Sequence, residues 1–271
     1  MTDLPVPDGA ALLRSLARPG TLVVLDFDGT LAPIVGDRHA AGMTRRSRAA
    51  LAAVARLYPV AILTGRSARD VRSRLQGVAV RWVIGSHGLE WPGESARRAA
   101  WRRQVRRWIA PLSARLAGWP GIELEVKPLA LAVHHRGAPP ASRAEARILR
   151  ATLDLPGVAT VLGKKVVNLM PRSAGDKGTA LARLARMSRA RRLIFVGDDV
   201  TDEAAFAAHL PIPAVTVRVG RALATCATYG LPRRSGVDLL LERLASARLA
   251  RPDSVGSRRG PAVTAARPSH R

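Results

Sequence analysis

The feature that most constrains the fold is a set of short aliphatic runs, each followed by a polar motif. The first run, TLVVL at residues 21–25, leads directly into the pentapeptide DFDGT. Continuous runs of this length are typical of strands buried on both faces of a parallel sheet. Four later runs have the same character: 60–63 (VAIL), 81–85 (RWVIG), 192–197 (RLIFVG) and 214–220 (AVTVRVG).

Segments with apolar residues at helical spacing lie between these runs. Residues 44–57 and 67–75 begin with Thr44 and Ser67, which are suitable N-caps, and two later helices are expected at 179–189 and 237–247. Strands that alternate with amphipathic helices indicate an α/β fold with a doubly wound parallel sheet. In that architecture ligands bind at the carboxyl ends of the strands, where the polar motifs lie.

The pattern changes after residue 95. A long basic helical stretch at 97–117 precedes strand-like runs at 122–126 and 129–135, a helix at 141–153 and further runs at 158–162 and 165–169. This order predicts a small α+β module inserted into the sheet domain. We expect a discontinuous, Rossmann-like sheet domain at 1–95 and 171–250 and a separate inserted α+β domain at 96–170. The last stretch, 251–271, is rich in Arg, Ser, Pro and Gly and is expected to be a disordered basic tail.

Composition narrows the class of protein. The 271 residues are 47% hydrophobic, which suffices for one core with an inserted module. The formal net charge of +24, from 44 Lys and Arg against 20 Asp and Glu, raises nucleic acid or an anionic membrane as partners. The arginines are scattered through Ala-rich helices without the interleaved aromatics that stack on bases, so a nucleic-acid function is not favoured. A positive field still attracts a phosphorylated small molecule.

The cysteine content and the apolar segments bear on location. Cys226 is the single cysteine, so the chain has no intramolecular disulfide and no thiolate metal cluster. The N-terminal residues lack the pattern of a secretory signal, and no run of about 18 apolar residues is present. We expect a cytoplasmic protein that is a monomer or weak dimer, with no membrane partner.

The motif DFDGT carries two acids in position to share a site. Asp26 and Asp28 are two residues apart on an extended segment, so their side chains point the same way. Two close carboxylates repel each other unless a cation compensates, and Mg²⁺ prefers oxygen ligands and bridges to phosphate. A solvated turn with a helix cap is the alternative. The buried strand that delivers both acids favours a functional site.

A second acidic group follows the run at 192–197. Asp198, Asp199 and Asp202 lie in the sequence GDDVTDE. Several carboxylates at two strand ends of one sheet need compensation, which a metal ion provides. The alternative is a capping array in which Asp199 or Thr201 only starts the next helix. We expect both roles, with Asp198 as the metal ligand and Asp199 or Asp202 in support.

Two further motifs offer groups that suit phosphate. Thr64-Gly65-Arg66 follows the run at 60–63, where a hydroxyl and free N–H groups at a helix N-terminus can bind a phosphoryl oxygen. Lys177 lies at a helix start, where it can neutralise charge on a nucleophile and on a phosphoryl group. Taken singly, Thr64 could be only a helix cap and Lys177 only a solvated lysine.

In chain order, DxDGT, TGR, DKG and GDDxTDE resemble the motifs of the haloacid dehalogenase superfamily of phosphotransferases. The resemblance implies that Asp26 attacks phosphorus in line to form an aspartyl-phosphate. It implies that Asp28 protonates the leaving oxygen and then activates water. Thr64 and Lys177 would hold phosphoryl oxygens. Mg²⁺ would be bound by Asp26, the backbone carbonyl of Asp28, and Asp198.

Longer segments resemble the trehalose-6-phosphate phosphatase family over about residues 20–245. They are DFDGTLAPIV at 26–35, GSHGLE at 85–90, EVK at 125–127, VHHR at 133–136 and GDDVTDE at 197–203. The resemblance implies that the inserted module is a cap that closes over a disaccharide. Residues implied in substrate binding are Gly65, Arg66, His87, Glu125, Lys127, His134, Arg136 and Asn168. For His134 and Arg136, an alternative is that they are strand residues that face the helices.

Asn168 departs from the family pattern, which usually has a glutamate in this strand that is expected to bind sugar hydroxyls. Asparagine donates and accepts hydrogen bonds but carries no charge, so sugar recognition is weakened or the substrate differs. The leading hypothesis is hydrolysis of trehalose 6-phosphate, the last step of trehalose biosynthesis. One alternative is a capped phosphatase that acts on sucrose phosphate or a glycosyl phosphoglycerate. A second is a non-catalytic phosphosugar-binding regulator, which would be marked by loss of Asp26, Asp28 or Lys177; all three are present.

Overall fold

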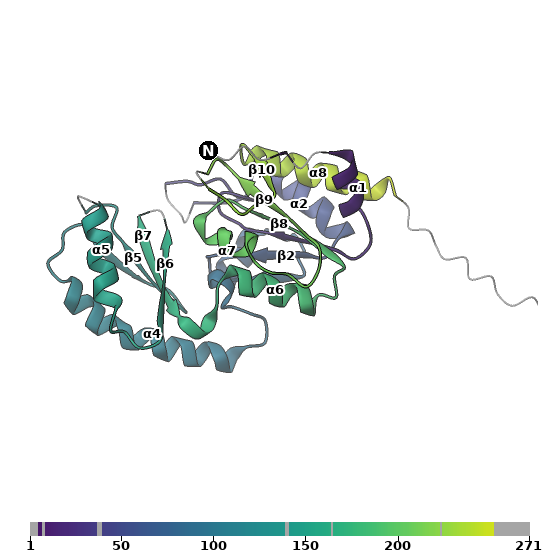
Figure 1. Ribbon diagram of the computed structural model, residues 1–271. Coiled ribbons are helices and arrows are strands. Elements are labelled where there is room, and N and C mark those ends of the chain that lie inside the picture. The colour runs from purple at the N-terminus through teal and green to yellow at the C-terminus, as the bar shows by residue number, and fades with distance from the viewer. Residues whose placement is uncertain are drawn as a thin grey trace, which may run out of the picture.

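The computed structural model describes residues 5–6, 9–36, 40–138, 141–163, 165–222 and 224–251, without the side chains of 141 and 142. Two sheets lie side by side, each with its own helices (Figure 1). The larger sheet has six parallel strands in the order β10-β9-β8-β1-β2-β3. Its strands are β1 (Thr21–Leu25), β2 (Val60–Leu63), β3 (Trp82–Ile84), β8 (Arg192–Gly197), β9 (Ala214–Val219) and β10 (Tyr229–Leu231).

The strand order confirms the doubly wound fold. The chain runs outward from β1 through β2 to β3, and then returns to the other side of β1 and runs outward again from β8 to β10. The direction therefore reverses between β1 and β8. The carboxyl ends of strands at such a reversal form the usual ligand crevice of open α/β sheets. The motif DFDGT follows β1 and the acidic group follows β8, so both motifs lie at this crevice.

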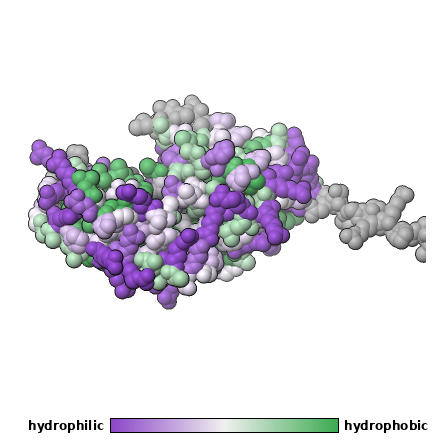
Figure 2. Space-filling model, turned by 60° about the horizontal axis from the view of Figure 1, so that its bottom comes forward, coloured by the Kyte–Doolittle hydropathy of each residue, from purple (hydrophilic) through white to green (hydrophobic). Residues whose placement is uncertain are grey.

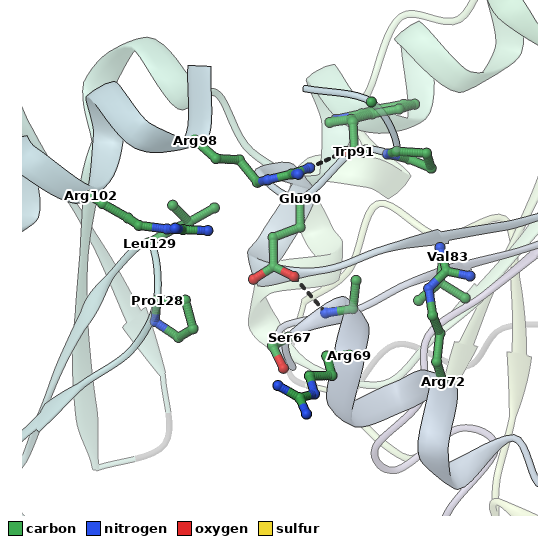
Figure 3. A pocket seen from close by; sticks show the side chains of 13 residues that line it. Ser67, Arg69, Arg72, Val83, Glu90, Trp91, Arg98, Arg102, Pro128 and Leu129 are labelled. Carbon is green, nitrogen blue, oxygen red and sulfur yellow. Dashed lines mark hydrogen bonds between the residues drawn. The ribbon is translucent and has the colours of Figure 1, made fainter. Parts of the chain in front are cut away.

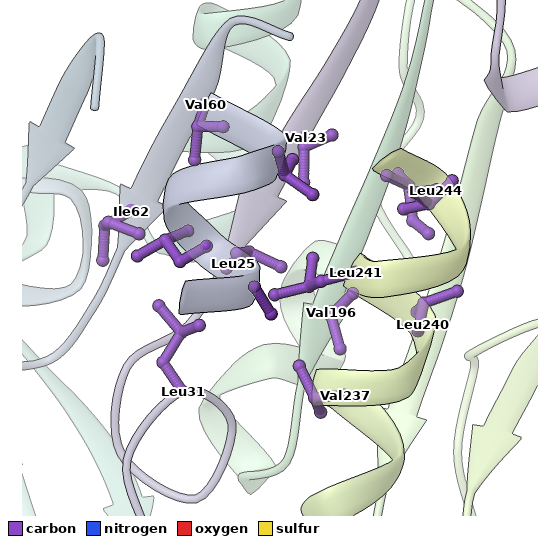
Figure 4. Close-up of a cluster of buried hydrophobic side chains, with 14 of the residues drawn as sticks. Val23, Leu25, Leu31, Val60, Ile62, Val196, Val237, Leu240, Leu241 and Leu244 are labelled. Atoms are coloured by element: carbon purple, nitrogen blue, oxygen red, sulfur yellow. The ribbon is translucent and has the colours of Figure 1, made fainter. Parts of the chain in front are cut away.

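Helices cover both faces of the large sheet, which explains why its strands are continuously apolar. One face packs against α1 (Ala10–Leu16), α2 (Arg45–Leu57), α3 (Ala68–Arg74) and α8 (Ser235–Leu249). Val23 and Leu25 of β1 point to this face and meet Leu241 of α8 (Figure 4). Leu22 and Val24 point to the opposite face, which packs against α6 (Lys177–Met187) and α7 (Glu203–Phe206). Alternate residues of one strand thus enter two different cores.

The strands of the smaller sheet lie between β3 and α6 in the sequence, so the chain leaves the large sheet after β3 and returns to it with β8. The antiparallel strands of the smaller sheet, in the order β4-β5-β7-β6, are β4 (Glu123–Val126), β5 (Leu131–His134), β6 (Val158–Gly163) and β7 (Val166–Pro171). The helices α4 (Ser95–Leu116) and α5 (Ala141–Thr152) cover one face, where Trp108 and Ile148 pack against Val133 and Val167. We call α4, α5 and β4–β7 the cap, and the rest of the described chain the core. Whether residues 96–170 form a separate domain stays a prediction.

Most helices and strands lie where the sequence predicts them, and the differences have local causes. Helix α6 begins at Lys177 rather than at 179, because Asp176 caps it: Asp176 Oδ1 accepts the Thr179 N–H at 2.8 Å. The short elements α1 and β10 were not predicted, whereas the helix expected after Asp199 is present as a 3₁₀ turn followed by α7. Three 3₁₀ turns occur at η1 (Ser86–Gly88), η2 (Arg172–Ala174) and η3 (Val200–Asp202). The predicted disordered tail, apart from Arg251, lies outside the described residues.

Hydrophilic side chains extend over both the cap and the core on the face shown in Figure 2, with hydrophobic residues interspersed among them. Within the described ranges, no helix combines the length and the apolar character needed to cross a membrane.

Candidate active site

A buried lysine joins two buried carboxylates at the reversal point of the sheet. Asp26 follows β1, and Lys177 is the first residue of α6. Lys177 Nζ lies 3.1 Å from Asp26 Oδ1 and 2.6 Å from Asp202 Oδ1. Burial by itself lowers the pKa of Lys177, but the carboxylates of Asp202 and Asp26 outweigh it and raise the pKa above its ordinary value. Lys177 is therefore a fixed positive charge beside Asp26.

Three carboxylates converge on this lysine. Oxygen atoms of Asp26, Asp198 and Asp202 all lie within 4.8 Å of one another. Burial raises the pKa of Asp26 well above its usual value, although Lys177 opposes the shift. Burial, followed by the charge of Asp202, raises the pKa of Asp198 to about 7. These shifts show that the site carries more negative charge than Lys177 alone compensates.

The donor set fits a divalent metal ion. Hard cations bind carboxylate oxygens. Asp26 Oδ1 is buried, and its contact with Lys177 Nζ at 3.1 Å is an ion pair that lacks good hydrogen-bond geometry, so the oxygen can still accept a cation. Asp198 Oδ1 receives one side-chain hydrogen bond, from the Thr30 hydroxyl at 3.2 Å. Asp26 and Asp198 thus come from adjacent strands, β1 and β8, and offer oxygen atoms to the same point.

Asp202 and Asp199 differ from these two acids because their oxygens already have donors. Asp202 Oδ1 accepts from Lys177, and its Oδ2 accepts the backbone N–H groups of Asp198 and Asp199 at 2.9 Å each. The Asp199 carboxylate caps η3 and accepts from the Thr201 hydroxyl at 3.3 Å. Asp202 therefore orients Lys177 and the loop after β8. Metal ligation by Asp199 and Asp202 stays a prediction.

Asp28 is bound by Arg66, a pairing that no sequence motif predicts. Arg66 Nε donates to Asp28 Oδ2 at 2.6 Å, and Arg66 Nη2 donates to Asp28 Oδ1 at 2.7 Å. Arg66 Nη1 also donates to Asp70 Oδ2 at 2.8 Å. Arg66 was expected to contact substrate; in this structure it occupies both carboxylate oxygens of Asp28. Helical spacing predicts the contact of Arg66 with Asp70, four residues later, but not its contact with Asp28.

The loop after β2 presents Thr64 and Gly65 to the site. Thr64 Oγ1 accepts the Arg66 N–H at 3.2 Å, so its hydroxyl proton remains available for another acceptor. Gly65 lies against the imidazole of His87, since a Cβ added to Gly65 would be 2.6 Å from His87 Cε1. Burial, with Lys177 and Lys127 nearby, lowers the pKa of His87 to about 3. The imidazole is therefore neutral at physiological pH, with Nδ1 buried and free of partners among the described residues.

Four of the predicted cap residues form one network on the uncovered face of the small sheet. His134 Nε2 lies 2.9 Å from Glu125 Oε2, and Lys127 Nζ lies 4.0 Å from the same oxygen. Lys127 Nζ also donates to Asn168 Oδ1 at 3.5 Å. The network joins β5 and β7 to β4 and to Lys127, the residue that follows β4. Asn168, although uncharged, thus takes part in it by accepting a hydrogen bond from a lysine.

Two cavities connect these cap residues with core loops. A cavity of about 240 Å³ is lined by Gly65 and Arg66 from the core and by Glu125 and Lys127 from the cap. A second, of about 440 Å³, is lined by Arg136 together with Glu125, His134 and the core segment 35–36. These cavities place four of the predicted cap residues toward the core: Glu125, Lys127, His134 and Arg136. Arg136 lines a different cavity from Lys127, and Asn168 lines neither.

Comparison with known proteins identifies the family. Residues 24–228, most of the chain, match the family model described as Trehalose-phosphatase. The chain belongs to the trehalose-phosphatase family. The family resemblance of its motifs is thereby confirmed, and so is its nature as a phosphatase of a sugar-phosphate family.

Individual relatives support the assignment to the trehalose-phosphatase family. The trehalose-phosphate phosphatase of Mycobacterium marinum is 36% identical over 267 residues, which cover 91% of this chain and 67% of the relative. The C-terminal domain of trehalose-6-phosphate phosphatase from C. albicans has a TM-score of 0.74 at 21% identity, with 90% of this chain and 98% of that chain covered. A sucrose-phosphatase from Synechocystis has a TM-score of 0.57 at 18% identity, covering 84% and 98%. At such identities the structures show the fold alone.

Proposed function

We propose that this member of the trehalose-phosphatase family hydrolyses trehalose 6-phosphate to trehalose and phosphate, with Asp26 as nucleophile. The observation that carries the mechanism is the buried Asp26–Lys177 pair beside the acidic group at the reversal of the sheet. Family membership carries the substrate. Lys177, held by Asp202, neutralises charge on Asp26 and on the phosphoryl group as they approach each other.

In the first step, a carboxylate oxygen of Asp26 attacks phosphorus, and the bond between phosphorus and the sugar oxygen breaks. The Thr64 hydroxyl donates a hydrogen bond to a phosphoryl oxygen. Asp28 gives a proton to the departing sugar oxygen. Because Arg66 occupies both oxygens of Asp28 in this structure, Arg66 must move away from Asp28 before this proton transfer.

In the second step, Asp28 accepts a proton from water, whose oxygen attacks phosphorus of the aspartyl-phosphate. The bond from phosphorus to Asp26 breaks, so phosphate leaves and Asp26 is restored. Asp26, Asp198 and the backbone carbonyl of Asp28 would hold Mg²⁺, which when bound supplies positive charge to the phosphoryl oxygens.

The cap supplies recognition of the sugar in this proposal. The cap domain, residues 96–170, presents Glu125 and Lys127 toward Gly65 and Arg66. Glu125 in turn contacts His134, and Lys127 contacts Asn168. Carboxylate, imidazole, ammonium and amide groups together provide donors and acceptors for sugar hydroxyls. Capped phosphatases for sucrose phosphate or glycosyl phosphoglycerate share the core chemistry and remain the alternative, because they differ in these cap residues.

A substrate panel tests the assignment. Purified protein is assayed with trehalose 6-phosphate, sucrose 6-phosphate, a glucosyl phosphoglycerate and an aryl phosphate, and kcat/KM is compared. We expect trehalose 6-phosphate to be preferred, Asp26→Asn to abolish turnover, and Asn168→Glu to raise kcat/KM for trehalose 6-phosphate. Turnover of trehalose 6-phosphate no faster than of the aryl phosphate would sink the substrate assignment. Unchanged turnover by Asp26→Asn would sink the mechanism.

We further propose Mg²⁺ as the resident ion, a monomer or weak dimer, a cytoplasmic location, and no function on nucleic acid. Activity after dialysis against a chelator and return of individual ions identifies the metal. Light scattering gives the oligomeric state. Polyanion affinity at two salt concentrations, with and without residues 251–271, tests the last point.

A further inference from the structure

A cavity outside the catalytic centre lies between the core helix α3 and the cap helix α4. Its volume is about 500 Å³, within the range of roughly 300–1,000 Å³ that small-molecule sites occupy. Arg69 and Arg72 line it from α3, and Arg98 and Arg102 line it from α4 (Figure 3). Glu90, from the segment that leads into the cap, lies between the two helices.

Most of the positive charge of this cavity has no ion-pair partner within the described part of the chain. Arg69, Arg72 and Arg102 form no ion pair or hydrogen bond with any residue that the structure describes. Arg98 donates to the backbone oxygen of Trp91 at 2.5 Å, and its charge also acts on the Glu94 carboxylate, which is paired more closely with Arg183.

The single acid of the cavity is already engaged. Glu90 Oε1 accepts the Ser86 hydroxyl at 2.6 Å, and Glu90 Oε2 accepts the Ala68 N–H at 2.7 Å. Glu90 therefore fixes the start of α3 and offers little to the arginines. Four guanidinium groups face one carboxylate, and apolar walls that include Leu129 strengthen the resulting field.

We propose that this cavity binds a small multivalent anion that carries phosphate or carboxylate groups at two positions. Two positions are required because the arginines come from two helices, and guanidinium groups bind such anions through charge-assisted, bidentate hydrogen bonds. The ligand joins α3 of the core to α4 of the cap. It thereby resists movement of the cap relative to the core and lowers kcat, a consequence that rests on the proposed phosphatase function.

Titration calorimetry with the full chain tests the site. The probes are inorganic pyrophosphate and, separately, citrate, in buffer with EDTA so that metal-assisted binding at Asp26 does not contribute. The cavity variant is Arg69→Gln/Arg102→Gln. The matched control is Arg103→Gln/Arg107→Gln, which removes the same charge at residues that line another cavity. Both control residues lie on α4, the helix that also carries Arg102.

We expect one pyrophosphate or citrate per chain, with affinity at least about tenfold weaker in the cavity variant and unchanged in the control. The probe that binds with higher affinity shows whether the site prefers phosphate or carboxylate groups. Absence of saturable binding by both probes overturns the proposal, and so does an equal loss of affinity in the two variants. Because binding is measured without turnover, failure of the substrate panel leaves this result intact. Absence of binding, conversely, leaves the phosphatase proposal standing.

Discussion

At the scale of single residues, Gly29 shows how little space the site allows. Gly29 has φ of +75°, in the left-handed region that favours glycine, and a Cβ at this position would be 1.9 Å from Asp198 Oδ2. The turn out of β1 can therefore approach the acid after β8 only because no side chain intervenes.

Replacing Gly29 by alanine should displace Asp198 and weaken metal binding by at least about tenfold, with a parallel loss of kcat/KM. Metal titration and steady-state kinetics measure the two effects. Gly42→Ala is the control, because a Cβ there meets nothing within 4 Å and its φ is not positive. Equal, small effects of both substitutions would contradict the role assigned to Gly29.

The raised pKa of Asp198 predicts that metal binding releases protons. With a pKa of about 7 in the metal-free protein, Asp198 is largely protonated at pH 6 and largely ionised at pH 8. A metal ion requires the ionised form, so affinity should rise with pH up to about 7 and then level off. Calorimetry in buffers of different ionisation enthalpy counts the protons. Identical proton release at pH 6 and pH 8 would argue against this titration.

Asp198 changes the free energy of unfolding with pH in the direction opposite to most acidic groups, whose pKa is lowered in the folded protein. The pKa of Asp198 lies above its ordinary value of 3.8, so between about pH 4 and 7 the native metal-free protein holds more protons than the unfolded chain. Its free energy of unfolding should therefore fall as pH rises through that window. Bound metal should remove this loss.

At the scale of helices and strands, the cap of α6 links stability with chemistry. Asp176 satisfies the Thr179 N–H, and it sets the start of the helix so that Lys177 is the first residue. Asp176→Ala should cost about 1 kcal/mol of stability and also lower kcat, because Lys177 loses its fixed position.

Thr44→Ala provides the matched comparison. Thr44 caps α2 by accepting the Ser47 N–H at 3.1 Å, on a helix that contributes none of the site residues discussed above. This variant should lose a similar free energy in urea unfolding and keep its kcat. If both variants kept kcat, the cap of α6 would have no part in positioning Lys177.

Some elements could be predicted from the sequence because their signals are local. Strand β1 has five consecutive aliphatic or β-branched residues, and α2 has both apolar periodicity and a capping threonine. Strand β10 has only three residues, Tyr229–Leu231, one of them glycine, so its pairing with β9 and not its own sequence makes it a strand. Helix α6 starts before the predicted residue 179 because the Asp176 side chain accepts the Thr179 N–H, which brings Lys177 and Gly178 into the helix.

The same distinction holds for the site. Asp26, Lys177 and Asp198 could be placed together because each lies at the end of a strand or the start of a helix in one sheet. The pairing of Arg66 with Asp28 could not, since it joins residues 38 apart through side-chain geometry that no spacing rule encodes. For the same reason, no spacing rule predicts that Asp202 accepts hydrogen bonds from Lys177 with one oxygen and from the loop after β8 with the other.

At the scale of the whole molecule, the net charge of +24 should act on the rate of substrate capture. The substrate is an anion, and salt shortens the reach of the field from about 10 Å at 0.1 M to about 3 Å at 1 M. We expect kcat/KM for trehalose 6-phosphate to fall several-fold over that range while kcat changes little. Kinetics in a salt series measure both constants. A flat kcat/KM would show that the charge does not steer the substrate.

If Asp28 is the acid, as proposed, the Arg66–Asp28 pair controls when the enzyme can react. While both oxygens of Asp28 are held by Arg66, a phosphate ester whose departing group needs a proton finds no donor. An ester with a stable departing anion needs none and can still transfer its phosphoryl group to Asp26. We therefore expect the protein to be inert toward sugar phosphates that fail to draw Arg66 away, so that one ion pair would protect other phosphate esters from hydrolysis.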